Sequence, residues 1–298
     1  MSTTAPSTVR PAPQSAVAWA NGFAGIAIFA GSLPATKVAV AAFDPVFLTL
    51  ARAAIAGLVA VLLLAVLRPA RPARADLASL VIVSLGVVVG FPLLTALALK
   101  HVTSAHAIVF IGLTPVATAL FGAIRGGERP RPAFWAFSVL GSAIVAAYAL
   151  RGGAEASLIG DGLMLLAILV IGLGYAEGGR LSRRLGGWQV ICWALLLSLP
   201  AMLPAALLTR PDTFDGVGLP GWLALGYVGL FSMLIGFVFW YRGLALGGIA
   251  AVGQLQLLQP FLGFALAALV LGEAVGWPLL AATGAVVLCV AGARRYAH

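Results

Sequence analysis

The stretch QLQLLQPFLGFALAALVLGE, Gln254 to Glu273, places three glutamines and a proline at the start of an otherwise apolar run. About 20 consecutive apolar residues are enough for a helix to cross a bilayer. Lipid offers no hydrogen-bonding partners, so amide side chains at membrane depth must find partners within the protein or in a cavity. The stretch therefore predicts a membrane-spanning helix whose first turns carry a polar function.

The rest of the chain has the same character. It is 62% hydrophobic and 9% charged, with a mean hydropathy of +1.08, whereas soluble domains are about 25% charged. The net charge of +9 comes from residues between apolar runs, where membrane orientation and anionic lipid explain it better than nucleic acid. The two cysteines lie within apolar segments, with neither disulfide nor metal spacing, and no cofactor is expected.

Hydropathy predicts an all-α membrane protein with ten spans. Residues 1–16 are polar and rich in proline, and they lack the apolar core of a signal peptide, so we expect a disordered cytoplasmic tail. The predicted spans cover residues 17–38, 46–67, 77–98, 105–124, 133–150, 158–178, 189–208, 220–241, 249–271 and 277–293.

The basic residues predict the orientation of these spans. With a cytoplasmic N-terminus, 13 of the 18 basic residues fall in cytoplasmic segments and four fall outside. Cytoplasmic loops carry an excess of lysine and arginine. Both termini are therefore expected in the cytoplasm. The arginine-rich loops and the high alanine and glycine content favour a GC-rich bacterium, and so a bacterial inner (plasma) membrane.

An internal repeat relates the two halves. Placing Pro115 over Pro260 aligns IVFIGLTPVATALFGAIRGGE with GQLQLLQPFLGFALAALVLGE, and each proline is followed 13 residues later by a glutamate, Glu128 or Glu273. The repeats are predicted at 17–150 and 157–293, with five spans each. Because five is odd, the second repeat must be inverted relative to the first, which is an architecture typical of secondary transporters.

At this point the chain resembles the ten-span, EamA-like exporters of the drug/metabolite transporter superfamily. The resemblance lies in GSLPATKVAVAAFDPVFLTLARAAIAG, ALKHVTSAHAIVFIGLTPVATALFGAIRGGE and GLALGGIAAVGQLQLLQPFLGFALAALVLGE. It implies ten helices, a central cavity and outward movement of metabolites, and it marks Lys37 as a possible contact for a substrate carboxylate. The aromatic-amino-acid exporters are the most similar branch. The sixth span departs from the pattern, with Glu177 and a GGRLSRR tail.

The glutamines allow two interpretations. On an α-helix, Gln256 and Gln259 lie within about 60° of each other, whereas Gln254 points elsewhere. Pro260 has no N–H, so the carbonyl of Gln256 loses its helical partner. These groups either join helices by hydrogen bonds or line a cavity that recognises amine and carboxylate groups; we favour the cavity.

Several other residues are candidates for the same site. Pro115 and Pro260 are predicted kinks, and Glu128 and Glu273 are predicted helix-end or gating contacts. Glu177 is expected to pair with Arg180 three residues later, with a proton-carrying carboxylate as the alternative. Trp240 and Tyr241 are expected in an aromatic belt near the inner interface. The predicted cavity set comprises Gln254, Gln256, Gln259, Asn21, Tyr175, His106, Thr114 and Lys37; local bonding of Thr114, an interfacial His106 and a snorkelling Lys37 are the simpler alternatives.

Other classes of function were weighed against transport. The sequence contains no nucleophile elbow, HExxH helix, P-loop or dinucleotide fingerprint, so neither an enzyme nor an ATP-driven pump is expected. A channel is disfavoured by the inverted repeat. The prediction is a secondary transporter that exports small metabolites by alternating access, with aromatic or bulky apolar amino acids favoured and drugs or lipophilic cations as the alternative. Its expected partners are a small-molecule substrate and the bilayer, as a monomer or weak dimer, without nucleic acid or metal.

Overall fold

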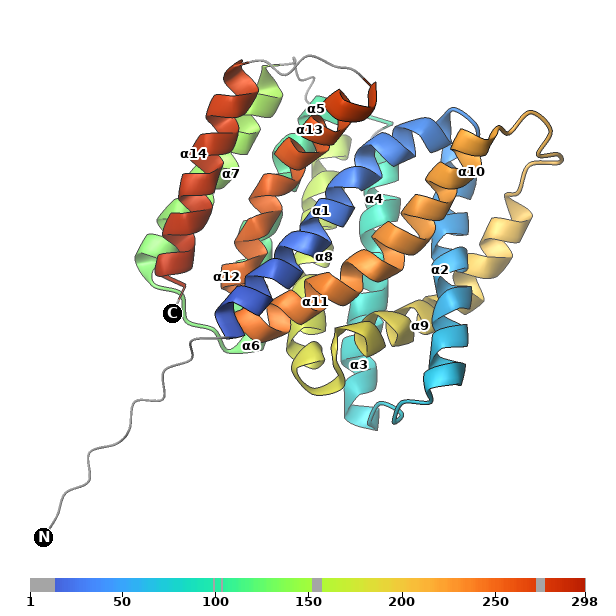
Figure 1. Ribbon diagram of the computed structural model, residues 1–298, viewed down its shortest axis with the longest axis horizontal. Helices are drawn as coiled ribbons and strands as arrows, with labels where there is room; N and C mark the ends of the chain where they lie inside the picture. The colour runs from blue at the N-terminus through green and yellow to red at the C-terminus, as the bar shows by residue number, and fades with distance from the viewer. Residues whose placement is uncertain (1–13, 99, 103, 152–156, 272–276, 298) are drawn as a thin grey trace, which may run out of the picture.

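The computed structural model describes residues 14–98, 100–102, 104–151, 157–271 and 277–297, and those residues form a bundle of helices (Figure 1). Eight helices within the described part are long and apolar enough to cross a membrane, and Pro132–Tyr148 is a shorter apolar helix. An all-helical, multi-span membrane protein is therefore confirmed. Glu273 and most of the predicted N-terminal tail lie outside the described residues.

The described helical segments follow the predicted spans closely. In the first half they are α1 (Gln14–Val40), α2 (Pro45–Leu67), α3 (Arg74–Val83), η1 (Ser84–Gly90), α4 (Phe91–Ala98), α5 (Ser104–Ile111), α6 (Thr114–Gly126) and α7 (Pro132–Leu150). In the second half they are α8 (Leu158–Leu185), α9 (Gly187–Leu208), α10 (Leu219–Gly226), η2 (Tyr227–Ile235), α11 (Gly236–Gly247), α12 (Ile249–Gly253), η3 (Gln254–Leu258), α13 (Gln259–Leu271) and α14 (Trp277–Arg295).

Four of the ten predicted spans are not uniform α-helices. The third and the eighth contain π-helical segments, η1 and η2. The fourth is interrupted by a turn at Gly112 and Leu113, and the ninth winds as a 3₁₀-helix through η3. The sequence predicted kinks at the two prolines but neither π segment, because a π-bulge has no sequence signature as clear as proline. The irregular segments occupy corresponding spans in the two halves.

Glycines allow the closest contacts between helices. A Cβ atom on Gly243 of α11 would lie 2.6 Å from the backbone nitrogen of Gly22 in α1. A Cβ atom on Gly172 of α8 would lie 2.7 Å from Cβ of Ala117 in α6. Association of helices in lipid depends on such close packing, because burial of apolar surface gives little drive there. The α1–α11 and α6–α8 contacts therefore require residues without side chains.

The interior of the bundle is aromatic. Trp240 and Tyr241 of α11 are fully buried, so the prediction that they form an interfacial belt is wrong. The ring of Trp240 packs edge-on against that of Tyr175 in α8, with centroids 5.5 Å apart, and against that of Phe29 in α1, at 6.4 Å. These residues face inward because close α1–α11 packing turns this side of α11 toward the bundle.

The outward side of the bundle is apolar in a manner typical of lipid contact. On α2, the side chains of Leu58, Leu62 and Val66 are 50%, 60% and 68% exposed. Soluble monomers rarely expose large contiguous apolar patches. The position of these residues at spacings of four along one helix indicates a stripe that faces the bilayer.

Candidate functional site

The fourth span breaks immediately before Pro115. Pro115 lies in the first turn of α6, where a missing N–H costs nothing. The hydroxyl of Thr114 donates a hydrogen bond to the carbonyl of Ile111 at 2.7 Å. Local bonding of Thr114, one of the two interpretations of this residue, is therefore what the structure contains, and it supplies a donor to a carbonyl near the break.

The 3₁₀ winding of the ninth span places Gln256 and Gln259 on the same face. In the 3₁₀ segment, residues three apart eclipse one another, so Gln256 aligns with the first residue of α13, Gln259. The amide of Gln256 donates to the hydroxyl of Thr118 in α6 at 3.2 Å and to the carbonyl of Gly253 at 3.0 Å. The break in the fourth span and the polar start of the ninth are thus joined by a side-chain hydrogen bond. For Gln256 the structure therefore contains the helix-joining bond, which was the alternative to the favoured cavity interpretation.

Gln254 lies on a different face, as its position in the sequence predicted. Its side chain is fully buried, and neither its amide nitrogen nor its amide oxygen has a partner among the described residues. Gln259 is half-buried beside Pro260. Leaving a buried polar group without a hydrogen bond costs about 1–3 kcal/mol. The amide of Gln254 therefore has donors and an acceptor that another group could bond.

The remaining candidate residues are spread over several helices. Asn21 is half-buried and donates to the carbonyl of Val17 in its own helix at 2.8 Å. Tyr175 is buried in the aromatic interior. His106 pairs with Asp161 of α8 at 2.6 Å. Lys37 belongs to α1, but its side chain lies outside the described part.

Glu128 stabilises the start of the ninth span. Its two carboxylate oxygens accept hydrogen bonds from the backbone N–H groups of Ile249 and Ala250, each at 2.7 Å. Arg183 of α8 donates to the same carboxylate at 2.8 Å. Gly127 and Gly248 both adopt positive φ, 71° and 92°, which favours glycine. A carboxylate from one half thus caps the first helix of the ninth span in the other half, where free N–H groups and the helix dipole favour negative charge.

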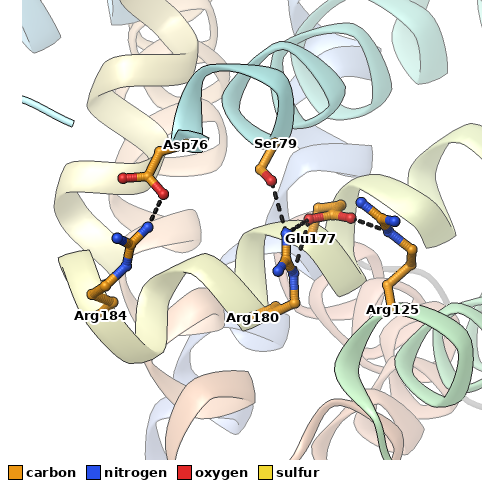
Figure 2. Close-up of polar contacts among 6 residues, drawn as sticks. All are labelled: Asp76, Ser79, Arg125, Glu177, Arg180 and Arg184. Atoms are coloured by element: carbon orange, nitrogen blue, oxygen red, sulfur yellow. Dashed lines mark hydrogen bonds and ion pairs between the residues drawn. The ribbon is translucent and has the colours of Figure 1, made fainter. Parts of the chain in front are cut away.

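A cluster of ion pairs joins the end of α8 to its neighbours (Figure 2). Glu177 is fully buried and accepts from Arg180 of the same helix at 2.7 Å, as predicted, and from Arg125 of α6. Arg180 also donates to the hydroxyl of Ser79 in α3 at 2.9 Å. The pairing of Glu177 with two arginines matches the predicted ion-pair role of this carboxylate.

The tail of α8 extends this cluster further. Arg184 pairs with Asp76 of α3, and Asp76 also accepts a hydrogen bond from the backbone N–H of Ala73 at 3.0 Å. Through Arg180, Arg183 and Arg184, α8 is therefore bonded to α3 and to Glu128 beyond α6. We call this part of the protein, which contains these arginines, the arginine-rich end.

Replacing Glu177 with glutamine tests how much this cluster of ion pairs contributes to stability. Glutamine keeps the size of the side chain but removes the charge shared by Arg125 and Arg180, so we expect the free energy of unfolding to fall by about 2 kcal/mol. Thermal unfolding in detergent measures the change. Asp215→Asn, in an exposed loop, is the control and should leave the melting temperature unchanged; an equal melting temperature for Glu177→Gln would contradict the prediction.

Sequence reasoning missed several partners, among them Thr118, Asp161 and Asp76. Thr118 lies one turn after Thr114 and shares its helix face, so the sequence could have indicated Thr118 as a candidate residue. Asp161 and Asp76 each lie in the first turn of a helix, where carboxylates are common for local reasons. Nothing in the sequence indicated that they pair with His106 and Arg184, because those partners are 55 and 108 residues away.

Comparison with known proteins adds an independent line of evidence. The EamA-like transporter family matches residues 14–149 and again residues 158–294. The chain is 65% identical over 279 residues to the uncharacterized transporter YdeK of Bacillus subtilis, covering 94% of this chain and 97% of the relative. It is 26% identical over 248 residues to a probable terminal-alkyne amino-acid exporter of Streptantibioticus cattleyicolor, covering 83% of each.

A solved crystal structure has the same fold. It matches with a TM-score of 0.78 and 22% sequence identity, over 93% of this chain and 97% of the other. At that identity the likeness concerns the fold alone. Because the family matches nearly the whole chain in two segments, and because the described residues form a multi-span helical bundle, the protein belongs to the EamA-like transporter family.

Proposed function

We propose that this transporter exports amino acids, with aromatic or bulky apolar side chains favoured, across the bacterial plasma membrane by alternating access. The observation that carries the proposal is the hydrogen bond from Gln256 to Thr118. It joins the fourth span, which is interrupted just before Pro115, to the ninth span, which contains Pro260. Irregular helices and polar groups form the substrate sites of many transporters. Both termini are proposed to be cytoplasmic, on the positive-inside rule.

The chemistry of other candidate groups supports an amino acid as substrate. Amides both donate and accept, so Gln254 and Gln259 can bond a carboxylate and an ammonium group. The indole N–H of the buried Trp240 has no acceptor among the described residues, and its ring lies against Tyr175. Aromatic walls attract both apolar side chains and ammonium groups. The distant relationship to an amino-acid exporter also favours this class.

Transport by purified protein in liposomes tests the proposal. Labelled phenylalanine, tryptophan and alanine are compared with a nucleotide sugar and a lipophilic cation, with empty vesicles as background. Saturable uptake of amino acids that unlabelled amino acids compete away would support the proposal. Uptake of the cation alone would replace amino acids by drugs as the substrate class, and no uptake of any compound by folded protein would contradict a carrier for these compounds.

Replacing Gln259 with leucine tests the site itself. Leucine is close in size but has no hydrogen-bonding groups, so we expect at least a tenfold fall in uptake at low substrate concentration, because a site that bonds polar groups loses roughly 1–3 kcal/mol with each one. Gln189→Leu, a glutamine in the first turn of α9, is the matched control. Equal uptake by the Gln259 and Gln189 variants would remove Gln259 from the site.

A further inference from the structure

A groove lies between α3 and α9, beside the connection from α2 to α3, at the arginine-rich end. It has a volume of about 400 Å³ and is lined mainly by leucines, including Leu77 and Leu80 of α3 and Leu197 of α9. Arg71 contributes the one charged side chain in its lining. Leu77 and Leu197 are 46% and 42% exposed, which is the exposure expected of residues that face lipid. No group of the proposed substrate site takes part in this groove.

The two polar side chains of the groove are available to a ligand. Arg71 is exposed and forms no ion pair with the described residues. The nearest acidic side chain along the chain, Asp76, is already bonded to Arg184 and to the N–H of Ala73. The indole N–H of Trp193, which also lines the groove, is buried without an acceptor among the described residues.

The depth of these groups corresponds to that of a phospholipid. Arg71 precedes the start of α3, whereas Trp193 and Leu80 each lie six residues into a helix. At 1.5 Å per residue, that is about 9 Å along each helix from the end at which Arg71 lies. A phosphate at Arg71 would therefore place its ester oxygens toward Trp193 and its acyl chain along the leucines.

We propose that this groove binds one anionic phospholipid, with the phosphate against Arg71 and an acyl chain between α3 and α9. Three observations on the described residues support this occupant rather than a helix of another protein. The charge is at the membrane-surface end, the walls below it are apolar, and the one buried free donor is an indole N–H, which bonds oxygen. Arginine is suited to phosphate because its donors form a planar fork, and basic residues at this end attract anionic headgroups.

Native mass spectrometry of the purified protein tests the proposal with phosphatidylglycerol and phosphatidylcholine of identical acyl chains. The wild-type protein should retain one phosphatidylglycerol molecule and melt at a higher temperature with it than with phosphatidylcholine. Arg71→Gln should weaken phosphatidylglycerol retention about fivefold, the effect expected of one basic residue at an anionic surface. Arg129→Gln removes an exposed arginine outside the groove and should have little effect.

A second variant tests the apolar part of the groove. Leu197→Trp places a larger side chain into the groove from an exposed position, so the fold should be retained and its melting temperature in lipid-free detergent should match that of the wild type. Retention of both lipids should fall. Equal losses in the Arg71 and Arg129 variants would indicate general attraction to the arginine-rich end and overturn the site, as would unchanged retention in Leu197→Trp.

Discussion

Replacing Glu128 with alanine is expected to lower the free energy of unfolding by about 3 kcal/mol. The carboxylate accepts from two backbone N–H groups, those of Ile249 and Ala250, and from Arg183. Alanine would leave all three donors without this acceptor. The loss of a helix cap costs roughly 0.5–2 kcal/mol, and charge-assisted hydrogen bonds roughly 1.5–3 kcal/mol, with the arginine discounted because it is partly exposed to solvent.

The Glu128→Ala substitution should also loosen the start of α12 locally. Because α12 leads directly into the polar segment η3, we expect faster hydrogen exchange at Ile249 and Ala250 and at least a tenfold fall in transport. Hydrogen exchange with mass spectrometry and thermal unfolding in detergent measure the two effects. Glu128→Gln keeps one oxygen acceptor and should lose about half as much stability. Unaltered exchange in the alanine variant would show that the cap does not hold the start of α12.

Replacing Gly243 with leucine is expected to prevent stable folding. Even a Cβ atom at this position would lie 2.6 Å from the nitrogen and 2.8 Å from Cα of Gly22. These are backbone atoms, so no change of side-chain rotamer relieves the clash, and α1 and α11 would have to separate. Overpacking costs about 1–3 kcal/mol where side chains can adjust, and more is expected here because the contact is between backbones.

Size-exclusion chromatography of the detergent-extracted protein measures this effect. We expect Gly243→Leu to elute as aggregate or to be lost, while Gly284→Leu elutes as a single peak. Gly284 is the matched control, because a Cβ atom there would meet nothing within 4 Å and the substitution slightly favours the helix. A single peak with the wild-type melting temperature for Gly243→Leu would contradict the close packing of α1 against α11.

Contacts made by Glu128 and Arg125 connect the first half of the chain to the second. Glu128 comes from the first half but caps the start of the ninth span, and Arg125 comes from the first half but pairs with Glu177 of α8. Movement of one half against the other would have to break or carry along these bonds.

Local properties of the sequence were enough to predict the spans. The ninth was predicted at 249–271, and α12, η3 and α13 together cover Ile249 to Leu271. Charges at span ends and apolar runs of suitable length lie within short windows, so no distant contact is needed to place them. The Glu177–Arg180 pair was predictable for the same reason, since residues three apart on a helix are neighbours.

The tertiary structure decided which side chains bond one another and which side of each helix faces the interior. The sequence by itself determined that this chain is a multi-span helical membrane protein, with a proline in its fourth span and a polar, proline-containing start to its ninth. It did not determine that Glu128 caps α12, that the hydroxyl of Thr118 accepts a hydrogen bond from Gln256, or that Trp240 faces the interior. Each of these depends on how two helices distant in sequence pack together, and that packing is set by backbone contacts at glycines such as Gly22 and Gly243, which no periodicity of the chain records.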